Sequence, residues 1–340
     1  MEKIDFVITW VDGADPAWLA EKQKYQKTDI EISSGDANAE CRYRSETELL
    51  RYWFRGVEKF APWVNKIYFV TCGQKPEWLN ESHIKLKMIN HRDYIVSKYL
   101  PTYNSNAIEL NYHRMEDLSE EYVMFNDDIF LLQSIGPEYF FRNGNPVLDT
   151  DLRYYKKVGL NNWSKVAFNN YCVVNMSFDM RRSIWENRKK WFNVKELGWK
   201  RSMQNIACFM ANKTLPFSIY GHIAQPHLKS TLQEVWEKWN EVMDITSSHK
   251  FRSDDQVNQW LLCSWNQAKG RFYPTTKEKR GININVSPDM IKRAVDIIKN
   301  QLVPQVCLND SEKNINAEFC NAELIKAFDT ILPNKSSFEK

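Results

Sequence analysis

Two neighbouring aspartates, Asp127 and Asp128, are the residues of this chain best suited by type and spacing to bind a metal ion. They follow Asn126 and the apolar run 122–125, which predicts a buried strand. In open α/β sheets, ligands bind outside the carboxyl ends of the strands, and paired carboxylates at such a position can hold Mg²⁺. The same polar residues are also typical of a simple turn, so the local sequence leaves both interpretations open.

A second group of polar residues recurs every four positions, at Ser105, Glu109 and His113. On a helix over 105–118, this spacing places the three side chains on one face, which could line a binding site. The N-terminus of that helix also suits a phosphate, because its free backbone N–H groups and its dipole favour an anion. The structural alternative is that Asn104 or Ser105 caps the helix and that Glu109 faces solvent.

Histidines, an arginine and further aspartates occur in the last third of the chain. Residues 221–227 predict a loop with two histidines, of which His222 could act as a general base or bind a phosphate. Arg252 carries a planar guanidinium that matches phosphate oxygens, and an aspartate pair that includes Asp255 follows it. Alternatively, residues 253–256 form a capping box at the start of a helix.

The pattern of an apolar run that ends in Asn-Asp returns near the end of the chain. Residues 305–308 precede Asn309 and Asp310. This pattern predicts another carboxylate at a strand end, although a turn explains it equally well.

Strand and helix patterns alternate in the first half of the chain. Strands over 4–11, 66–71 and 122–126 alternate with helices over 46–60 and 105–118. This alternation predicts an α/β fold with a Rossmann-like, mostly parallel sheet.

The second half has mostly helical patterns. Helices are expected near 163–186, 231–243, 254–268, 287–301 and 315–331. We therefore expect residues 1–340 to form one catalytic unit, in which an α/β half over 1–135 and a variable segment over 136–220 precede a helical half over 221–340 that completes the site.

Composition excludes several classes of protein. The 46 basic and 43 acidic residues nearly balance, which argues against nucleic acid as a partner. No apolar run is long enough for a membrane span or an obvious export signal. The seven cysteines form no C-x-x-C pair, which argues against a disulfide framework or a zinc site and favours a reducing cytoplasm. Short basic runs such as 188–190 could contact an anionic membrane surface.

Four blocks of the sequence resemble the signatures of the Stealth family, the sugar-1-phosphate transferases of bacterial capsule and exopolysaccharide synthesis that also include the lysosomal-enzyme N-acetylglucosamine-1-phosphotransferase. The blocks are 4–18, with Trp-Val-Asp-Gly; 48–128, with Leu-Pro-Thr, Ala-Ile-Glu and Asn-Asp-Asp; 221–255, from Gly-His onward; and 306–310, Val-Cys-Leu-Asn-Asp. Within the second block, residues 53–56 depart from the family's usual pattern.

The resemblance implies a set of active-site residues. The residues that match family positions at the active site are Ser105, Glu109, Asp127, Asp128, His222, Arg252 and Asp310, together with Asp12 and Arg44; Asn104 and Asp255 are expected to bind substrate. Arg42 is an alternative to Arg44 for contact with the nucleotide sugar, because the stretch 42–51 is one residue longer than the family pattern.

The resemblance also implies a reaction. A UDP-sugar binds with Mg²⁺ or Mn²⁺, and an acceptor hydroxyl attacks the β-phosphorus. UMP leaves, and a hexose-1-phosphate is transferred to the acceptor. The resemblance to the family favours N-acetylglucosamine-1-phosphate as the transferred group. The acceptor would be an oligosaccharide or a lipid-linked glycan, and segment 136–220 could determine its specificity. Asp127, Asp128 and Asp310 would hold the metal and Arg252 a phosphate, with His222 or Glu109 as general base.

Two other functions remain open on the sequence. A metal-dependent glycosyltransferase would use the same donor but attack carbon 1 and release UDP. A non-catalytic polysaccharide-binding protein would use the 13 Trp and 15 Tyr residues as sugar platforms.

Overall fold

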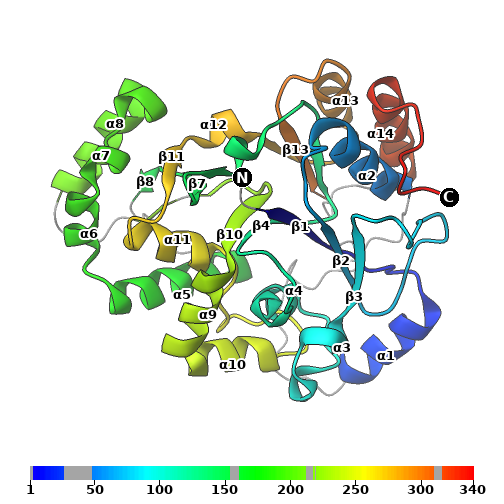
Figure 1. Ribbon diagram of the computed structural model, residues 1–340, viewed down its shortest axis with the longest axis horizontal. Helices are drawn as coiled ribbons and strands as arrows, with labels where there is room; N and C mark the ends of the chain where they lie inside the picture. Colours follow the sequence, from blue (N-terminus) through cyan, green and yellow to red (C-terminus); the bar gives the residue numbers. More distant parts are fainter. Residues whose placement is uncertain (1–2, 27–47, 154–160, 212–216, 219, 310–315) are drawn as a thin grey trace.

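The computed structural model describes residues 3–26, 48–153, 161–211, 217–218, 220–309 and 316–340. Its centre is a five-stranded sheet of order β10-β4-β1-β2-β3 (Figure 1). The strands are β1 Ile4–Thr9, β2 Ile67–Thr71, β3 Leu86–Asn90, β4 Glu121–Phe125 and β10 Gln225–Leu228. Strands β1 to β4 are parallel and β10 is antiparallel to β4. The predicted α/β fold with a mostly parallel sheet is therefore confirmed.

The period of two along each strand explains why both faces of the sheet are covered. In β1, Phe6 and Ile8 enter one hydrophobic core, and Val7 between them enters the other. Helices α2 Glu48–Phe60, α13 Ile291–Lys299 and α14 Ala317–Ile331 contribute to the first core. Helices α9 Lys229–Lys238, α10 Asn240–Ser248 and α11 Trp260–Ala268 contribute to the second.

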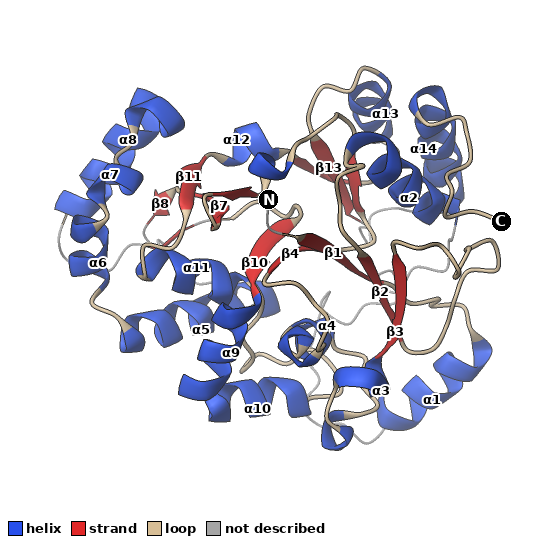
Figure 2. Cartoon of the chain, viewed as in Figure 1, coloured by secondary structure: helices blue, strands red, loops and turns tan. Residues whose placement is uncertain are grey.

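Three small sheets lie beside the central one (Figure 2). Their strands are β5 Ile129–Leu131, β12 Ile282–Asn285 and β13 Gln305–Asn309; β6 Phe141–Arg142, β7 Asn145–Asp149 and β11 Tyr273–Thr275; and β8 Leu152–Arg153 with β9 Phe217–Ser218. The second half is thus less purely helical than predicted, because strands of two to five residues carry too short a pattern to recognise.

The remaining helices complete the list. They are α1 Pro16–Gln26, α3 His91–Tyr94, α4 Ser105–Glu109, α5 Asn162–Ser177, α6 Met180–Glu186, α7 Arg188–Trp191, α8 Val194–Met210 and α12 Lys277–Arg280, with 3₁₀ turns at Ser97–Tyr99, Tyr112–Arg114 and Pro137–Tyr139. None of the helices in the described part of the chain combines the length and the apolar character that a membrane span requires.

Four predicted helices have different bounds. The one expected near 231–243 is α9 and α10, which meet at Trp239, and side-chain amides explain the bounds of two others. The helix predicted over 105–118 ends at Glu109, because Asn111 places its own Nδ2 2.7 Å from the carbonyl of Ala107, which a longer helix would use for backbone bonding. The helix predicted over 254–268 begins only at Trp260, since Asn169 Nδ2 bonds the carbonyls of residues 254 and 256 at 2.9 and 2.8 Å.

The helix predicted over 163–186 is also two helices. Phe178 lies between them in an extended conformation, and the side chain of Asp179 caps the second by accepting from the backbone of Arg182.

Candidate active site

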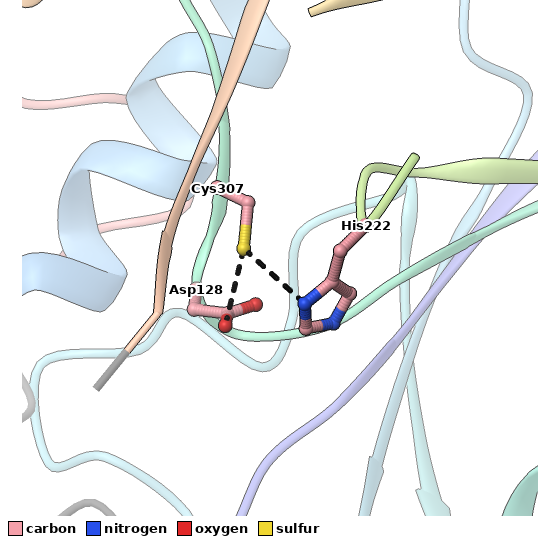
Figure 3. Close-up of side chains that lie close together, drawn as sticks. All are labelled: Asp128, His222 and Cys307. Atoms are coloured by element: carbon pink, nitrogen blue, oxygen red, sulfur yellow. Dashed lines mark hydrogen bonds between the residues drawn. The ribbon is translucent and has the colours of Figure 1, made fainter. Parts of the chain in front are cut away.

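Asp128, His222 and Cys307 meet at the carboxyl end of β4 (Figure 3). Asp128 lies in the turn between β4 and β5, and its carbonyl accepts from the backbone N–H of Leu308 in β13 at 2.7 Å. His222 precedes β10, whose first residue, Gln225, pairs with Met124 of β4. Three segments far apart in sequence therefore bring one acidic, one imidazole and one thiol group together.

The three side chains lie close enough together to hold one metal ion. Each offers one atom, and these atoms all lie within 4.8 Å of one another. Cys307 Sγ is 3.4 Å from Asp128 Oδ2 and 3.8 Å from His222 Nδ1. Asn126 Nδ2 lies 3.2 Å from the other ring nitrogen, His222 Nε2. If His222 takes a proton from a substrate, one of these two contacts to its ring must be exchanged for the substrate.

Asp128 is suited to a cation. Asp128 is only 7% exposed, and its Oδ1 has no hydrogen-bond partner among the residues that the structure describes. A buried carboxylate oxygen without a donor is costly unless it is protonated or meets a positive charge. Mg²⁺ and Mn²⁺ favour such oxygen ligands, whereas the imidazole and thiol beside it suit softer metals. The carboxylate of Asp128 thus fits the predicted ion, with Cys307 outside its preferred ligand set.

A buried ion pair holds the loop that carries His222. Asp149 Oδ2 accepts from the backbone N–H of Gly221 at 2.9 Å. Arg280, which is fully buried, donates to the carbonyl of Ala224 at 2.6 Å and to the side chain of Gln225 at 3.0 Å, and lies 3.9 Å from Asp149. Burial raises the pKa of Asp149, and the nearby Arg280 acts against this rise. His222 is therefore fixed by buried polar groups on both sides of its loop.

A second polar cluster forms at the start of α4. Asn104 caps this helix, as expected, by accepting from the backbone of Asn106 at 3.1 Å. Ser105 Oγ accepts from Arg252 Nη2 at 2.7 Å. Glu109, one turn further along the helix, is buried rather than facing solvent. The sequence-predicted Ser105, Glu109 and Arg252 therefore lie in one cluster.

The pKa of Glu109 is strongly perturbed. Burial raises it from 4.5 to about 7, although the positive charge of Arg252 lowers it. A carboxyl group with this pKa exchanges protons near neutral pH, as a general acid or base requires.

Aromatic packing places the second cluster at the same edge of the sheet as the first. Tyr103, just before α4, stacks on Phe251 at 5.3 Å and meets Trp18 of α1 at 5.5 Å. Val11 and Cys72, which follow β1 and β2, pack against these rings. Because β4 neighbours β1, both clusters lie at the carboxyl ends of adjacent parallel strands.

Other predicted residues lie elsewhere or have local partners. His113 is not on the face of Ser105 and Glu109, because α4 ends first; its ring instead lies 5.6 Å from that of Trp236. Asp12 Oδ1 accepts from the backbone of Ala14 at 2.9 Å in the turn after β1.

Residues 253–256 form no capping box. Asp255 accepts from Ser253 Oγ at 2.6 Å and lies 3.1 Å from His249 Nε2. Asp127 directly precedes Asp128 after β4, while Arg44 and Asp310 lie outside the described residues.

Four residues of the site were missed by sequence reasoning: Asn126, Asp149, Arg280 and Cys307. Asn126 and Cys307 lie in the two motifs that contain the predicted aspartates, and this proximity in sequence could have indicated them. The expected loop over 221–227 was wrong for its second half, because His227 lies in β10 and is buried. Nothing in the local sequence around Asp149 or Arg280 indicates that they meet.

Comparison with known proteins identifies the class of enzyme. Models of the Stealth protein conserved regions CR1, CR2 and CR3 match residues 2–28, 42–148 and 221–266. The chain is 38% identical over 344 residues to the capsular polysaccharide phosphotransferase WcwK of Streptococcus pneumoniae, covering 100% of both proteins. It is 36% identical over 344 residues to the receptor polysaccharide phosphotransferase WefC of Streptococcus oralis, again covering 100% of both.

Among solved structures, the galactosyltransferase LgtC with donor and acceptor sugar analogs covers 98% of both chains at 9% identity. Its TM-score of 0.41 is too low to bear on function.

The sheet, the polar edge and the full-length relatives together define an enzyme of the sugar-phosphate transferase class. A non-catalytic polysaccharide-binding protein is set aside on this ground. The chain belongs to the Stealth protein family.

Proposed function

We propose that the enzyme transfers a hexose-1-phosphate from a UDP-sugar to a sugar hydroxyl in the synthesis of a capsular or extracellular polysaccharide. The relatives WcwK and WefC are named as polysaccharide phosphotransferases, which supports this substrate class. N-acetylglucosamine is the donor sugar that we favour. The proposal places the enzyme in the cytoplasm and treats the chain as one catalytic unit.

One observation supports the proposal above the others. The cluster of Asp128 and His222 and the cluster of Ser105, Glu109 and Arg252 lie at the carboxyl ends of neighbouring strands. A nucleotide sugar laid along this edge would meet a guanidinium, a buried acid and a carboxylate suited to a cation.

In the proposed reaction, the acceptor oxygen forms a bond to the β-phosphorus, and the bond from this phosphorus to the oxygen of UMP breaks. The bond between carbon 1 of the donor and its oxygen stays intact, so the anomeric configuration is kept. Arg252 would bind phosphoryl oxygens, with Ser105 orienting its guanidinium. A Mg²⁺ or Mn²⁺ ion at Asp128, together with Asp127 and Asp310, would supply neutralisation of phosphoryl charge.

A base must take the proton of the acceptor hydroxyl. His222 fills this role in our proposal; one of its ring nitrogens keeps its contact with Asn126 or Cys307, and the other exchanges its contact for the acceptor hydroxyl. Glu109 is the alternative, since its pKa of about 7 makes it a competent base at neutral pH. Asp12, Arg44, Asn104 and Asp255 would contact substrate.

The nucleotide product tests the proposal. The purified enzyme is incubated with UDP-N-acetylglucosamine, Mg²⁺ and an oligosaccharide acceptor, and the nucleotides are separated by chromatography. Release of UMP, with a phosphodiester signal in the ³¹P spectrum of the product, is the expected result. Release of UDP would instead identify a glycosyltransferase that attacks carbon 1, and would refute phosphotransfer.

A further inference from the structure

Helix α8 carries apolar side chains on its solvent side. Trp199, Met203, Ala207 and Met210 follow one another at intervals of three or four, which places them on one face of the helix. Trp199, Met203 and Met210 are 65%, 53% and 67% exposed. The opposite, buried face carries two apolar residues, Leu197 and Phe209, beside two polar ones, Ser202 and Asn205. The helix is therefore apolar on its solvent side as well as in part on its buried side, whereas a surface helix usually presents polar residues to solvent.

Neighbouring helices extend this apolar surface. Trp185 of α6 is exposed and stacks on Phe209 of α8, with ring centroids 6.0 Å apart. Val194 at the start of α8 is exposed as well. Figure 1 shows α6, α7 and α8 together at the left margin of the molecule. The residues Trp185, Val194, Trp199, Met203, Ala207 and Met210 are named the α6–α8 surface below.

Basic residues surround this surface. Residues 180–210 contain eight Lys and Arg but only two Glu, whereas the whole chain has 46 basic and 43 acidic residues. Of these basic side chains, Arg188, Lys189, Lys195 and Lys200 belong to exposed residues. The guanidinium of Arg188 lies 5.1 Å from the ring centre of Trp185, so positive charge and aromatic surface are adjacent.

We propose that the α6–α8 surface binds an anionic lipid bilayer. Tryptophan is favoured at the boundary between headgroups and acyl chains, and lysine and arginine beside it are attracted to anionic lipids. The segment 180–210 carries an excess of positive charge and also exposes the apolar side chains. An anionic membrane surface can bind both kinds of side chain.

The α6–α8 surface is joined to the active site through α8. Asn205, on its buried face, accepts from the backbone of Leu152 and donates to the carbonyl of Thr150, both at 3.0 Å. Thr150 directly follows Asp149, which binds the backbone of Gly221 next to His222. Binding through this surface would therefore fix the orientation of the active site relative to the bilayer. On the proposed function, this favours a lipid-linked glycan as the acceptor.

Vesicle flotation with the full-length protein tests the proposal. We expect binding to vesicles of equal parts phosphatidylcholine and phosphatidylglycerol, weakened by salt, and little binding to phosphatidylcholine alone. Lys195→Gln combined with Lys200→Gln should lower the partition coefficient about 25-fold, because each basic residue near the surface contributes about fivefold. Trp199→Ser combined with Met203→Ser should lower it about tenfold or more, since both lose apolar burial.

Matched control variants are available on helices α13 and α14, outside the α6–α8 surface. Lys292→Gln with Arg293→Gln on α13 removes two exposed basic residues, and Phe319→Ser on α14 removes an exposed aromatic ring. Neither should change binding. Equal loss in these controls, absence of binding, or equal binding to neutral vesicles would overturn the proposal. So would a dimer in sedimentation that Trp199→Ser dissociates, because the surface would then join two copies.

The flotation assay needs no nucleotide sugar, so it stands apart from the test of the proposed reaction. If UMP is released with a soluble oligosaccharide but no vesicle binding occurs, only the membrane surface fails. If vesicles bind but no UMP appears, only the reaction fails.

Discussion

Replacing Glu109 with glutamine should stabilise the protein much more at pH 8 than at pH 5. Burial raises the pKa of this carboxyl group from 4.5 to about 7, against the lowering effect of Arg252. Between these two values the folded protein binds the proton more tightly than the unfolded chain does. The free energy of unfolding therefore falls as the pH rises from 4.5 to 7, and the loss is complete above that range.

The size of the effect follows from the same two pKa values. Their difference corresponds to about 3 kcal/mol. Glutamine has nearly the same shape as glutamate but cannot ionise, so Glu109→Gln should unfold at higher urea concentration at pH 8, by up to about 3 kcal/mol. At pH 5, Glu109 is still mostly protonated in the folded protein but already partly ionised in the unfolded chain, so the two proteins should differ by only about 1 kcal/mol.

Activity measured on the same variant gives the result its meaning. If Glu109 takes the acceptor proton, Glu109→Gln lowers turnover by about 10²–10⁴ while it raises stability. The exposed Glu116→Gln is the control, with about 0.5 kcal/mol or less of change at either pH. A stability effect of Glu109→Gln that is equal at pH 5 and pH 8 would refute the argument from burial. Full turnover in the stabilised variant would exclude Glu109 as the base and favour His222.

The other predictions concern the remaining groups at the sheet edge. Arg252→Gln should raise the KM for the donor about tenfold or more. If Glu109 is the base, this variant should also move the midpoint of the pH–rate profile above 7, because Arg252 lowers the pKa of Glu109; an unchanged midpoint would exclude Glu109 from that role. His222→Ala should lower kcat by about 10²–10⁴ with donor binding retained in calorimetry, and near-normal turnover would remove it from the base role. Chelation should abolish activity and Mn²⁺ restore it, while calorimetry should find Mn²⁺ binding lost in Asp128→Asn but kept in Cys307→Ser; binding kept in Asp128→Asn contradicts the cation assignment. Arg280→Met should lower the free energy of unfolding by about 3 kcal/mol in urea, since Asp149 stays buried without its partner, and a cost below about 1 kcal/mol would contradict that pairing.

The sequence predicted the sheet edge well because strand ends carry local signals. The apolar run before Asp127 and Asp128 is β4, and the expected strands over 4–11 and 66–71 contain β1 and β2. Parallel strands present their carboxyl ends at one edge, so residues after β1 and β4 had to lie near one another once the α/β class was correct.

What the sequence could not predict depends on partners distant in the chain. Asn169 determines where α11 begins by bonding the carbonyls of residues 254 and 256. Likewise, Glu109 reads locally as a solvent-facing residue on a short helix, and only the packing around α4 buries it. The spacing of residues along a helix shows which side chains lie on the same face, but it does not show which other elements cover that face.

Cys307 shows how the missing information bears on chemistry. The absence of a C-x-x-C pair argues against a zinc site, and nothing in the sequence around Cys307 links its thiol to Asp128. The pairing of Cys307 with Ile129 across β13 and β5 carries its Sγ to within 3.4 Å of Asp128. A thiol is a weak donor that can satisfy one oxygen of Asp128 while leaving the other without a partner. The thiol of Cys307, which the sequence does not single out, therefore contacts the carboxylate on which the proposed cation site depends.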